Sequence, residues 1–277
     1  MAALDPYGVT DELEDALLDV MVTRLEVRAK HSFFRKVMRE YLDAIEIDAA
    51  GTVLEVGCGT GVAARTIVRR ASFAGRVMGI DLSPYLVEAA TRLANDEGLG
   101  GLVEFRSGDT RALDIPDATF DAVVAHTLVS HVQETLTVVE EAARVVKPGG
   151  WISIFDGDYA SMTFALEDPA QSRKYDEALI DAVVTSPRVM RQMPRLLRQA
   201  GLQLVRTFPY VMAEAGEGDF WLSAIDAYQR LAPQSGAMTE AEAANWADTL
   251  REASDNGVFF GASNYYTYIA RKLENST

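Results

Sequence analysis

The sequence predicts an α/β protein built on a doubly wound sheet, and three observations support this fold class. From residue 52 onward, short apolar runs suited to buried strands alternate with segments of helical periodicity. Glycine-rich turns follow several of these runs. Of the 277 residues, 48% are hydrophobic and no long polar tract interrupts them, so the chain can bury a large core. Strands separated by helices pair in parallel through right-handed crossovers, which places helices on both faces of the sheet.

The first 50 residues are predicted to be helical. In "FFRKVMREYLDAI", seven apolar side chains recur at helical spacing and form one broad face. They are Phe33, Phe34, Val37, Met38, Tyr41, Leu42 and Ile45. We therefore expect residues 1–50 to form a helical cap that precedes the α/β core.

Residues 51–160 are predicted to hold the core itself. Strands are expected at 52–57, 76–81, 102–109, 120–126 and 151–156, and helices at 62–71, 83–98 and 134–146. Ser83 is placed to cap the second of these helices, with Pro84 in its first turn. "KPGG", residues 147–150, should turn the chain into the fifth strand.

Residues 161–277 are predicted to complete the sheet. Helices at about 168–185 and 188–200 precede a strand at 202–211, and a helical insertion at about 217–254 leads to a last strand at 263–272. Alternation in that strand sends Tyr265 to one face and Tyr266 and Tyr268 to the other. The insertion carries Phe220, Trp221 and Leu222 and is interpreted as a lid over the ligand edge of the sheet.

Composition and charge exclude several classes of protein. Lys and Arg number 26 against 41 Asp and Glu, a net charge of −15 that repels phosphate backbones and disfavours a nucleic-acid partner. No apolar run approaches the roughly 20 residues of a membrane span, and the acidic start lacks the layout of a signal peptide. The single cysteine, Cys58, cannot form an internal disulfide. We expect a cytoplasmic protein without a membrane partner; its oligomeric state stays open.

The stretch "VLEVGCGTG", residues 53–61, predicts a ligand-binding turn. A dinucleotide fingerprint, G-x-G-x-x-G, would require a glycine or alanine where Val62 stands, and Gly61 comes one residue too early. The carboxylate of Glu55 would also repel a pyrophosphate. A ligand with a cationic end and no phosphate suits this turn better, and S-adenosylmethionine has an ammonium, a sulfonium and an adenosine.

Five motifs, taken together and in order, resemble those of class I S-adenosylmethionine-dependent methyltransferases. They are "VLEVGCGTG", "VMGIDLSP", "RSGDT", "FDAVVAHTLVSHV" and "VVKPGGWISI", and they span residues 52–156. The closest similarity is to the small-molecule group (methyltransferase type 11) typified by ubiquinone and menaquinone biosynthesis enzymes. The resemblance implies S-adenosylmethionine as cofactor and a Rossmann-like sheet of seven strands whose last strand is antiparallel.

The same resemblance implies a set of cofactor-binding residues. Asp81, followed by Leu82, would accept hydrogen bonds from the ribose hydroxyls; Asp109 with Thr110 would meet the adenine amine, and Asp114 is the alternative carboxylate. His126 would flank the methionine part. The glycine turn contributes Glu55, Gly57, Cys58, Gly59 and Gly61. Cys58 is interpreted as a small residue that the turn accommodates rather than as a nucleophile, because direct methyl transfer needs no covalent enzyme intermediate.

Histidines and late acids provide the candidates for chemistry. Either His126 or His131 could act as a general base, or each could be a buried loop histidine; we favour His131 as the catalytic residue. His31 is interpreted as a surface residue. Asp156 and Asp158 are expected to follow the fifth strand and face the pocket, where they could orient a substrate or merely turn the loop; Asp158 is kept as a substrate-binding candidate.

A basic stripe on the predicted helix 188–200 has two interpretations. Arg188, Arg191, Arg195 and Arg198 recur at spacings of three and four. The first interpretation is a solvated face paired with nearby carboxylates, and the second is a dock for an anionic substrate or partner.

Together these features predict an enzyme that transfers a methyl group from S-adenosylmethionine to a small-molecule acceptor by in-line displacement, giving S-adenosylhomocysteine. Two alternatives remain: a methyltransferase fold that binds the cofactor for a non-methylating or regulatory role, and a methyltransferase acting on protein or RNA. The acidic surface and the absence of an Asn/Asp-Pro-Pro-Tyr/Phe tetrapeptide disfavour a nucleic-acid substrate. No paired ligand spacing predicts a metal. The acceptor itself is left open.

Overall fold

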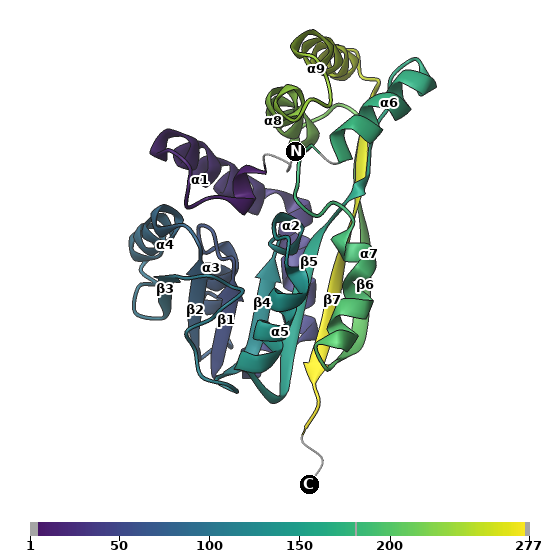
Figure 1. Ribbon diagram of the computed structural model, residues 1–277. Coiled ribbons are helices and arrows are strands. Elements are labelled where there is room, and N and C mark those ends of the chain that lie inside the picture. The colour runs from purple at the N-terminus through teal and green to yellow at the C-terminus, as the bar shows by residue number, and fades with distance from the viewer. Residues whose placement is uncertain (1–4, 181, 275–277) are drawn as a thin grey trace.

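A seven-stranded sheet forms the centre of the protein, as a computed structural model covering residues 5–180 and 182–274 shows (Figure 1). The strand order is β3-β2-β1-β4-β5-β7-β6, with β7 antiparallel to both of its neighbours and the others paired in parallel. The strands are β1 (Thr52–Val56), β2 (Arg76–Asp81), β3 (Val103–Ser107), β4 (Phe120–His126), β5 (Val146–Phe164), β6 (Leu202–Gly216) and β7 (Phe259–Lys272). The predicted fold class, including the antiparallel last strand, is confirmed.

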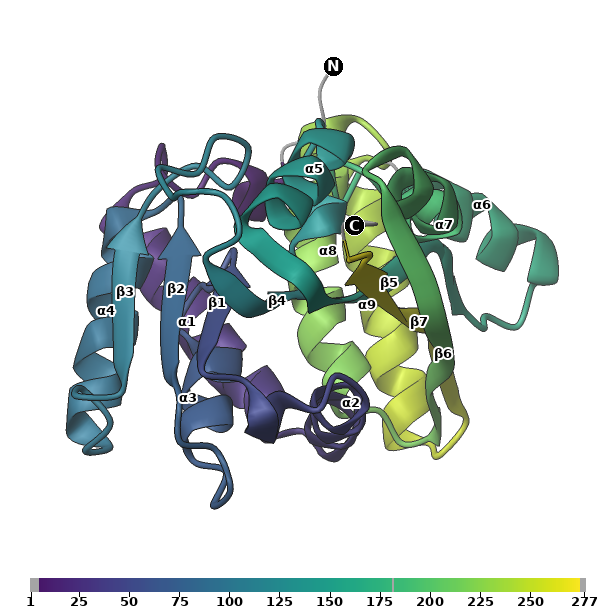
Figure 2. The ribbon, with the colours of Figure 1, turned by 90° about the horizontal axis from the view of Figure 1, so that it is seen from below.

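Helices cover both faces of this sheet. Figure 2 shows α5 and α7 on one face and α2 and α3 on the other. The helices are α1 (Asp15–Lys30), α2 (Ser32–Ala44), α3 (Val62–Val68), α4 (Pro84–Asp96), α5 (Thr135–Val145), α6 (Pro169–Ile180), α7 (Val189–Gln199), α8 (Phe220–Ser235) and α9 (Glu240–Asp255). Short 3-10 turns lie at Pro6–Gly8, Ile47–Ala49 and Val129–His131. Within the described part of the chain, no helix has both the length and the apolar character needed to cross a bilayer.

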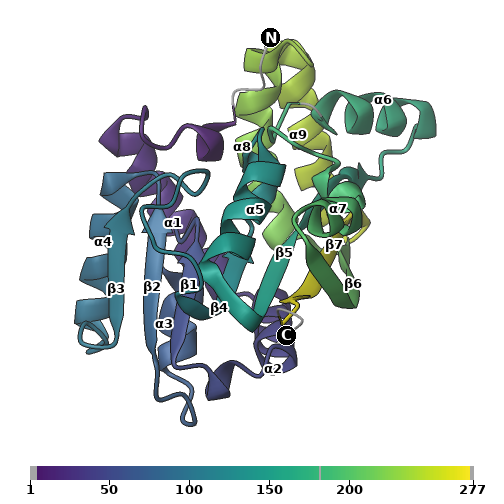
Figure 3. The ribbon, with the colours of Figure 1, turned by 60° about the horizontal axis from the view of Figure 1, so that its bottom comes forward.

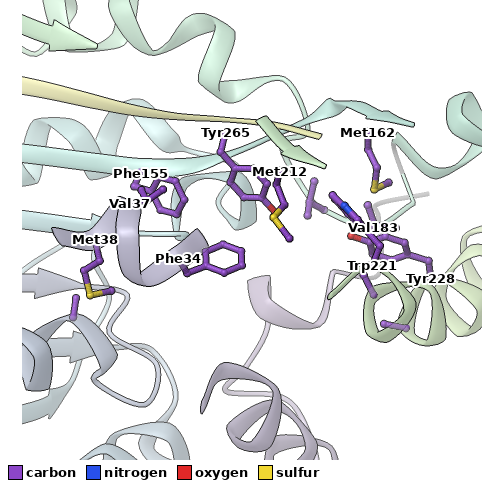
Figure 4. Close-up of a cluster of buried hydrophobic side chains, with 14 of the residues drawn as sticks. Phe34, Val37, Met38, Phe155, Met162, Val183, Met212, Trp221, Tyr228 and Tyr265 are labelled. Carbon is purple, nitrogen blue, oxygen red and sulfur yellow. The ribbon is translucent and has the colours of Figure 1, made fainter. Parts of the chain in front are cut away.

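The apolar face predicted for the N-terminal helices is confirmed. Six of its seven side chains are buried, and Phe33 is half-buried against the same core. That core continues from α2 through the sheet to α8, and Figure 4 shows Phe34, Phe155, Tyr265 and Tyr228 along it. The helix begins where the Nδ1 of His31 accepts a hydrogen bond from the backbone N–H of Phe33 at 3.3 Å. Packing therefore ties the N-terminal helices to the strands that lie beneath the site.

The junction between β2 and α4 forms as the sequence predicts. Ser83 is the N-cap of α4, and its Oγ accepts a hydrogen bond from the backbone N–H of Leu86 at 3.3 Å. Pro84 occupies the first helical position, where its missing N–H costs nothing. The short connection leaves Asp81 at the carboxyl end of β2, on the edge where parallel sheets bind ligands.

The late strands are longer than predicted. The sequence analysis expected Asp156 and Asp158 to follow the fifth strand. β5 runs to Phe164, however, so both residues lie within the strand. The reason is the long antiparallel partner: Asp156 pairs with Tyr266 and Asp158 with Asn264 of β7. A strand continues as long as a neighbouring strand pairs with its backbone hydrogen-bonding groups. The residue pattern of one strand does not indicate where its neighbour ends, so the length of β5 could not be predicted from its own sequence.

The insertion after β6 forms two helices, α8 and α9, beyond the carboxyl ends of the parallel strands. Figures 1 and 3 show α8 at this edge of the sheet, and α1 lies across the same edge from it. Trp221 of α8 and Trp246 of α9 both pack edge-on against Phe164 of the extended β5, at centroid distances of 5.5 and 5.4 Å. The extra length of β5 thus anchors the helices that border the site.

Candidate functional site

A cavity of about 340 Å³ lies where β1, β2 and β4 end, a size within the usual range for small-ligand sites. Its lining includes every residue that the sequence analysis assigned to the cofactor except Gly61, which directly follows the lining residue Thr60. The cofactor set is Glu55, Gly57, Cys58, Gly59, Asp81, Leu82, Asp109, Thr110 and His126. The fold therefore brings together, at one edge, residues contributed by four separate strand ends.

Gly57, Gly59 and Gly61 in the turn after β1 all have positive φ angles, of 63°, 51° and 74°. Side chains other than glycine are strained in this region. Space excludes them as well: a Cβ on Gly57 would lie 2.5 Å from Cδ1 of Leu128, and one on Gly61 would lie 2.3 Å from Cζ of Phe105. The turn needs glycine for its own conformation, and its bare backbone borders the cavity.

Asp81 connects three parts of the site. Its Oδ2 accepts a hydrogen bond from the backbone N–H of Gly59 at 2.7 Å, and its Oδ1 accepts one from Ser83 at 3.0 Å. The residue is 8% exposed and lines the cavity, and burial raises the pKa of its carboxyl. Asp81 thus organises the entry to α4 and lies in the wall of the cavity.

Glu55 is a buried carboxylate on the floor of the cavity. Its Oε2 accepts a hydrogen bond from the backbone N–H of Ala64 at 2.7 Å, in the first turn of α3, and the residue is only 2% exposed. Burial raises the pKa of Glu55 to about 8, and the nearby Asp81 adds to the rise while the backbone of α3 opposes it. A cationic ligand group would favour the ionised form of this carboxyl.

The raised pKa of Glu55 predicts a pH-dependent stability of the ligand-free protein. Because the folded state binds this proton up to about pH 8, while an unfolded glutamate releases it near 4.5, the free energy of unfolding should fall as pH rises across that window. Glu55→Gln has no charge to bury, so at pH 9 it should unfold at higher urea concentration, with a gain of at least about 1 kcal/mol. Urea titrations at pH 6 and pH 9 measure this, with the exposed Glu140→Gln as control. An unchanged pH slope in Glu55→Gln would contradict the assignment.

Asp109, and not its alternative Asp114, lies at the cavity. Arg111 donates to Asp109 from Nη2 at 2.8 Å and from Nε at 3.0 Å, and these hydrogen bonds lower the pKa of the carboxyl. Asp114 is exposed and is absent from the cavity lining. Cys58 also behaves as expected, because burial raises the pKa of its thiol and makes it a poor nucleophile.

His126 is a neutral imidazole at the end of β4. Its Nδ1 is 3.1 Å from the hydroxyl of Tyr41, and burial lowers its pKa to about 3, with a contribution from the charge of Arg28. A base this weak takes no proton near neutral pH. Of the two histidines that the sequence offered as bases, His126 is therefore suited to packing and hydrogen bonding.

His131 has the surroundings of a base. Its Nδ1 lies 2.8 and 3.0 Å from the two carboxylate oxygens of Asp5, which also accepts hydrogen bonds from the backbone N–H and the hydroxyl of Thr185. Burial alone would lower the pKa of His131, but the Asp5 carboxylate outweighs burial and raises it. Nδ1 donates to Asp5, and Nε2 has no hydrogen-bond partner among residues 5–180 and 182–274. The sequence analysis missed Asp5 entirely.

The two aspartates of β5 do not have the roles expected of them. Asp156 is fully buried and accepts hydrogen bonds from Ser130, through the backbone N–H at 2.9 Å and the hydroxyl at 3.1 Å, so it holds the turn that carries His131. Asp158 is 3% exposed, and both of its carboxylate oxygens lie 2.9 Å from Nε of Arg191, which donates one N–H shared between them. It lines neither this cavity nor the next. This ion pair agrees with the paired-face interpretation of the arginine stripe at Arg191.

A second cavity, of about 470 Å³, adjoins the first between α1, α8 and the extended strands. The two share Tyr7, Leu25, Arg28 and His131, so His131 stands where the cavities meet. The other residues that line the second cavity include Arg24, Tyr159, Tyr228, Tyr265 and His31. The sequence analysis expected His31 to be a surface residue, but it is half-buried at this cavity. Single-segment patterns gave no signal for this cavity, because its described walls come from seven separate parts of the chain.

Comparisons with known proteins agree with this geometry. Residues 54–154 match the model of a methyltransferase domain family. An uncharacterised 37.1 kDa protein in transposon TN4556 of Streptomyces fradiae is 30% identical over 266 residues, which cover 95% of this chain and 72% of that protein. A phosphatidylethanolamine N-methyltransferase of Cereibacter sphaeroides is 44% identical over 104 residues, 38% of this chain and about half (49%) of that enzyme.

The fold has close solved counterparts. A structure described as a methyltransferase of Bacillus halodurans superposes with a TM-score of 0.61 over 85% of this chain and 98% of that one, at 18% identity. At that identity the likeness concerns the fold alone. The family match, the relative that aligns with 95% of the chain and the glycine turn with its two buried carboxylates lead to one conclusion: this chain belongs to the class I S-adenosylmethionine-dependent methyltransferases.

Proposed function

We propose that this enzyme methylates a small molecule held in the second cavity, which we call the acceptor cavity. The observation that carries the proposal is the junction at His131, one of four lining residues that a 470 Å³ cavity shares with the 340 Å³ cofactor cavity. When bound, S-adenosylmethionine supplies a methyl group on a positively charged sulfur, which an acceptor displaces in line to leave S-adenosylhomocysteine. A cavity of this size suits a small molecule better than a protein or RNA segment.

The residues of the cofactor cavity fit S-adenosylmethionine. Two buried carboxylates suit a ligand with a cationic amino acid end and a ribose diol, and neither would tolerate a pyrophosphate. In our proposal Glu55 faces the ammonium and Asp81 the ribose hydroxyls. Asp109 and Thr110 meet the adenine, and His126 supports the methionine part. The side-chain-free turn leaves room for close approach of the ligand to the backbone.

His131 is proposed as the general base for this reaction. Nε2, which carries no proton while Nδ1 donates to Asp5, takes the proton that the acceptor loses when it gains the methyl group. Asp5 holds the ring in this tautomer and stabilises the imidazolium that forms, and Asp156 fixes the backbone of the turn beneath it.

Ligand binding provides the test. We expect calorimetry to show binding of S-adenosylmethionine and S-adenosylhomocysteine but not NAD, and the melting temperature to rise with the first two alone. Incubation with pools of small-molecule acceptors should then accumulate S-adenosylhomocysteine. Binding of NAD without either sulfur ligand would overturn the assignment of the cofactor cavity. Turnover on proteins or RNA but on no small molecule would overturn the acceptor class.

We further propose that residues 217–254 act as a lid. α8 contributes Phe220 and Tyr228 to the acceptor cavity, whereas Trp221 faces away into the core against Phe164. Amide hydrogen exchange across α8 should slow when S-adenosylhomocysteine and an acceptor found in the screen bind together, since a closed lid opens less often. Equal exchange in the free and ternary states would show that these helices are a fixed wall.

A further inference from the structure

The acceptor cavity is cationic in a protein whose net charge is −15. Among the described residues, its lining includes Arg24, Arg28 and Lys30 but only one carboxylate, Asp219. The other acid nearby, Asp5, lines the cofactor cavity and is already bound to His131. Since the surface as a whole is acidic, a local excess of positive charge around an enclosed space points to the charge of what enters it.

Arg28 lies where the two cavities meet, and its charge is not neutralised locally. Its Nη2 donates to the hydroxyl of Thr127 at 2.7 Å, and its guanidinium lies 5.5 Å from the ring centroid of Phe34. No carboxylate pairs with Arg28 or Arg24 in the part of the chain that the structure describes. Arg65, by contrast, forms ion pairs with two glutamates. Buried and half-buried arginines are normally paired in this way, so two without a carboxylate partner leave room for an anionic ligand.

Tyrosine hydroxyls complete the polar lining. Tyr159, Tyr228 and Tyr265 all line the cavity, and their hydroxyls form no hydrogen bond within the described ranges. Burial raises the pKa of Tyr228 to about 12, and Arg24 and Arg28 oppose the rise. The three side chains therefore remain protonated and available as donors. The charge of Arg28, which lines the same cavity, acts to lower the pKa of all three tyrosines.

An aromatic lining can also bind a cation, so the two possibilities must be compared. Rings such as these attract a quaternary ammonium through their faces. Here, however, a bound ammonium would share the cavity with two guanidiniums and, among the residues that the structure describes, a single carboxylate, Asp219. Like charges in an enclosed site repel each other more strongly than in water, so the arginines decide in favour of an anion.

We propose that the acceptor carries an anionic oxygen group, a carboxylate or a phosphate ester, attached to an apolar body. This inference rests on the function proposed above and names the class of its acceptor. Arg24 and Arg28 bind the anionic group, and Tyr228 donates a further hydrogen bond. The atom to be methylated lies beside His131. The body lies against apolar residues of the lining, among them Val183, Val184, Ala224, Ala227 and Leu231.

The test measures ligand charge preference at saturating S-adenosylhomocysteine, whose own affinity is determined first for every variant. The probes are benzoate, cinnamate and octanoate, their three matched amides, phenyl phosphate and phenyltrimethylammonium, measured by calorimetry. The wild type should bind the acids at least about tenfold more tightly than the amides. Arg24→Gln, which alters a residue of the acceptor cavity alone, should lose that preference and keep its affinity for S-adenosylhomocysteine. Arg198→Gln, an exposed arginine of α7 outside the cavity linings, is the matched control and should behave as wild type.

Each outcome decides the proposal. Tighter binding of benzoate than of phenyl phosphate identifies a carboxylate, and the reverse order identifies a phosphate ester; both support an anionic acceptor. Equal binding of acids and amides, preference for the ammonium probe, or no binding by any acid would overturn it. Failure of S-adenosylhomocysteine itself to bind would instead overturn the cofactor site, so the two proposals fail in distinguishable ways. Retention of the acid preference in Arg24→Gln would also overturn the proposed anion site.

Discussion

Replacing His131 with glutamine should lower kcat by about 100-fold or more, the usual contribution of a general base. Glutamine retains hydrogen-bonding capacity but takes no proton from the acceptor. The affinity for S-adenosylmethionine should stay close to that of the wild type. Steady-state turnover with a small-molecule acceptor from the screen, together with calorimetry of the cofactor, separates the two effects. Normal turnover at saturating substrates would show that alignment alone accounts for the reaction.

Two further variants sharpen this prediction. His126→Gln should show the opposite balance, with weaker cofactor binding and a smaller loss of kcat, because the low pKa of His126 excludes it as a base. Asp5→Asn removes the charge that raises the pKa of His131. Since only neutral His131 accepts a proton, kcat in the wild type should rise with pH through that raised pKa, and in Asp5→Asn the rise should move to lower pH. A variant that was merely misfolded would lose activity, but the pH at which kcat rises would stay the same.

Asp81→Asn should weaken S-adenosylmethionine binding by about 10- to 100-fold, because a hydrogen bond to a charged group contributes roughly 1.5–3 kcal/mol. Asparagine is the informative substitution, since one oxygen remains to accept a backbone hydrogen bond from Gly59 or Ser83. Calorimetry gives the dissociation constant, and the melting temperature of the free variant reports whether the turn survives. Asp114→Asn, an exposed acid of a neighbouring loop, should bind the cofactor as wild type does. An unchanged dissociation constant in Asp81→Asn would mean that another residue holds the ribose.

Local chemistry explains why the first half of the sheet could be predicted. β4 has the bounds expected for it, and Ser83 and Pro84 start α4 through contacts within four residues. The glycine turn could be predicted for the same reason, since its three positive φ angles are a local requirement. Where a residue's role depends on its own strand and the turn that follows, the sequence is sufficient to infer it.

The parts that could not be predicted depend on long-range contacts. Asp5 and His131 are 126 positions apart in the sequence. Neither the charge of Asp5 nor the position of His131 indicates that the two side chains meet. His31 looked like a surface residue until α8 placed Phe220 beside its ring, at a centroid distance of 5.7 Å. Asp158 looked available for substrate until α7 brought Arg191 to it. Side-chain roles of this kind depend on packing between separate elements.

The position of the acceptor cavity in the chain has an evolutionary consequence. Of the described residues that line it, His131 alone falls within 54–154, the segment shared with other methyltransferases. Under the proposed function, mutations at residues that line the acceptor cavity alone, such as Arg24, Ala227 and Tyr265, can therefore change which molecule is accepted without altering the lining of the cofactor cavity. Acceptor preference can then diverge rapidly among relatives that retain the same cofactor segment. Directed evolution toward new acceptors should accordingly concentrate on residues 6–31 and 219–231.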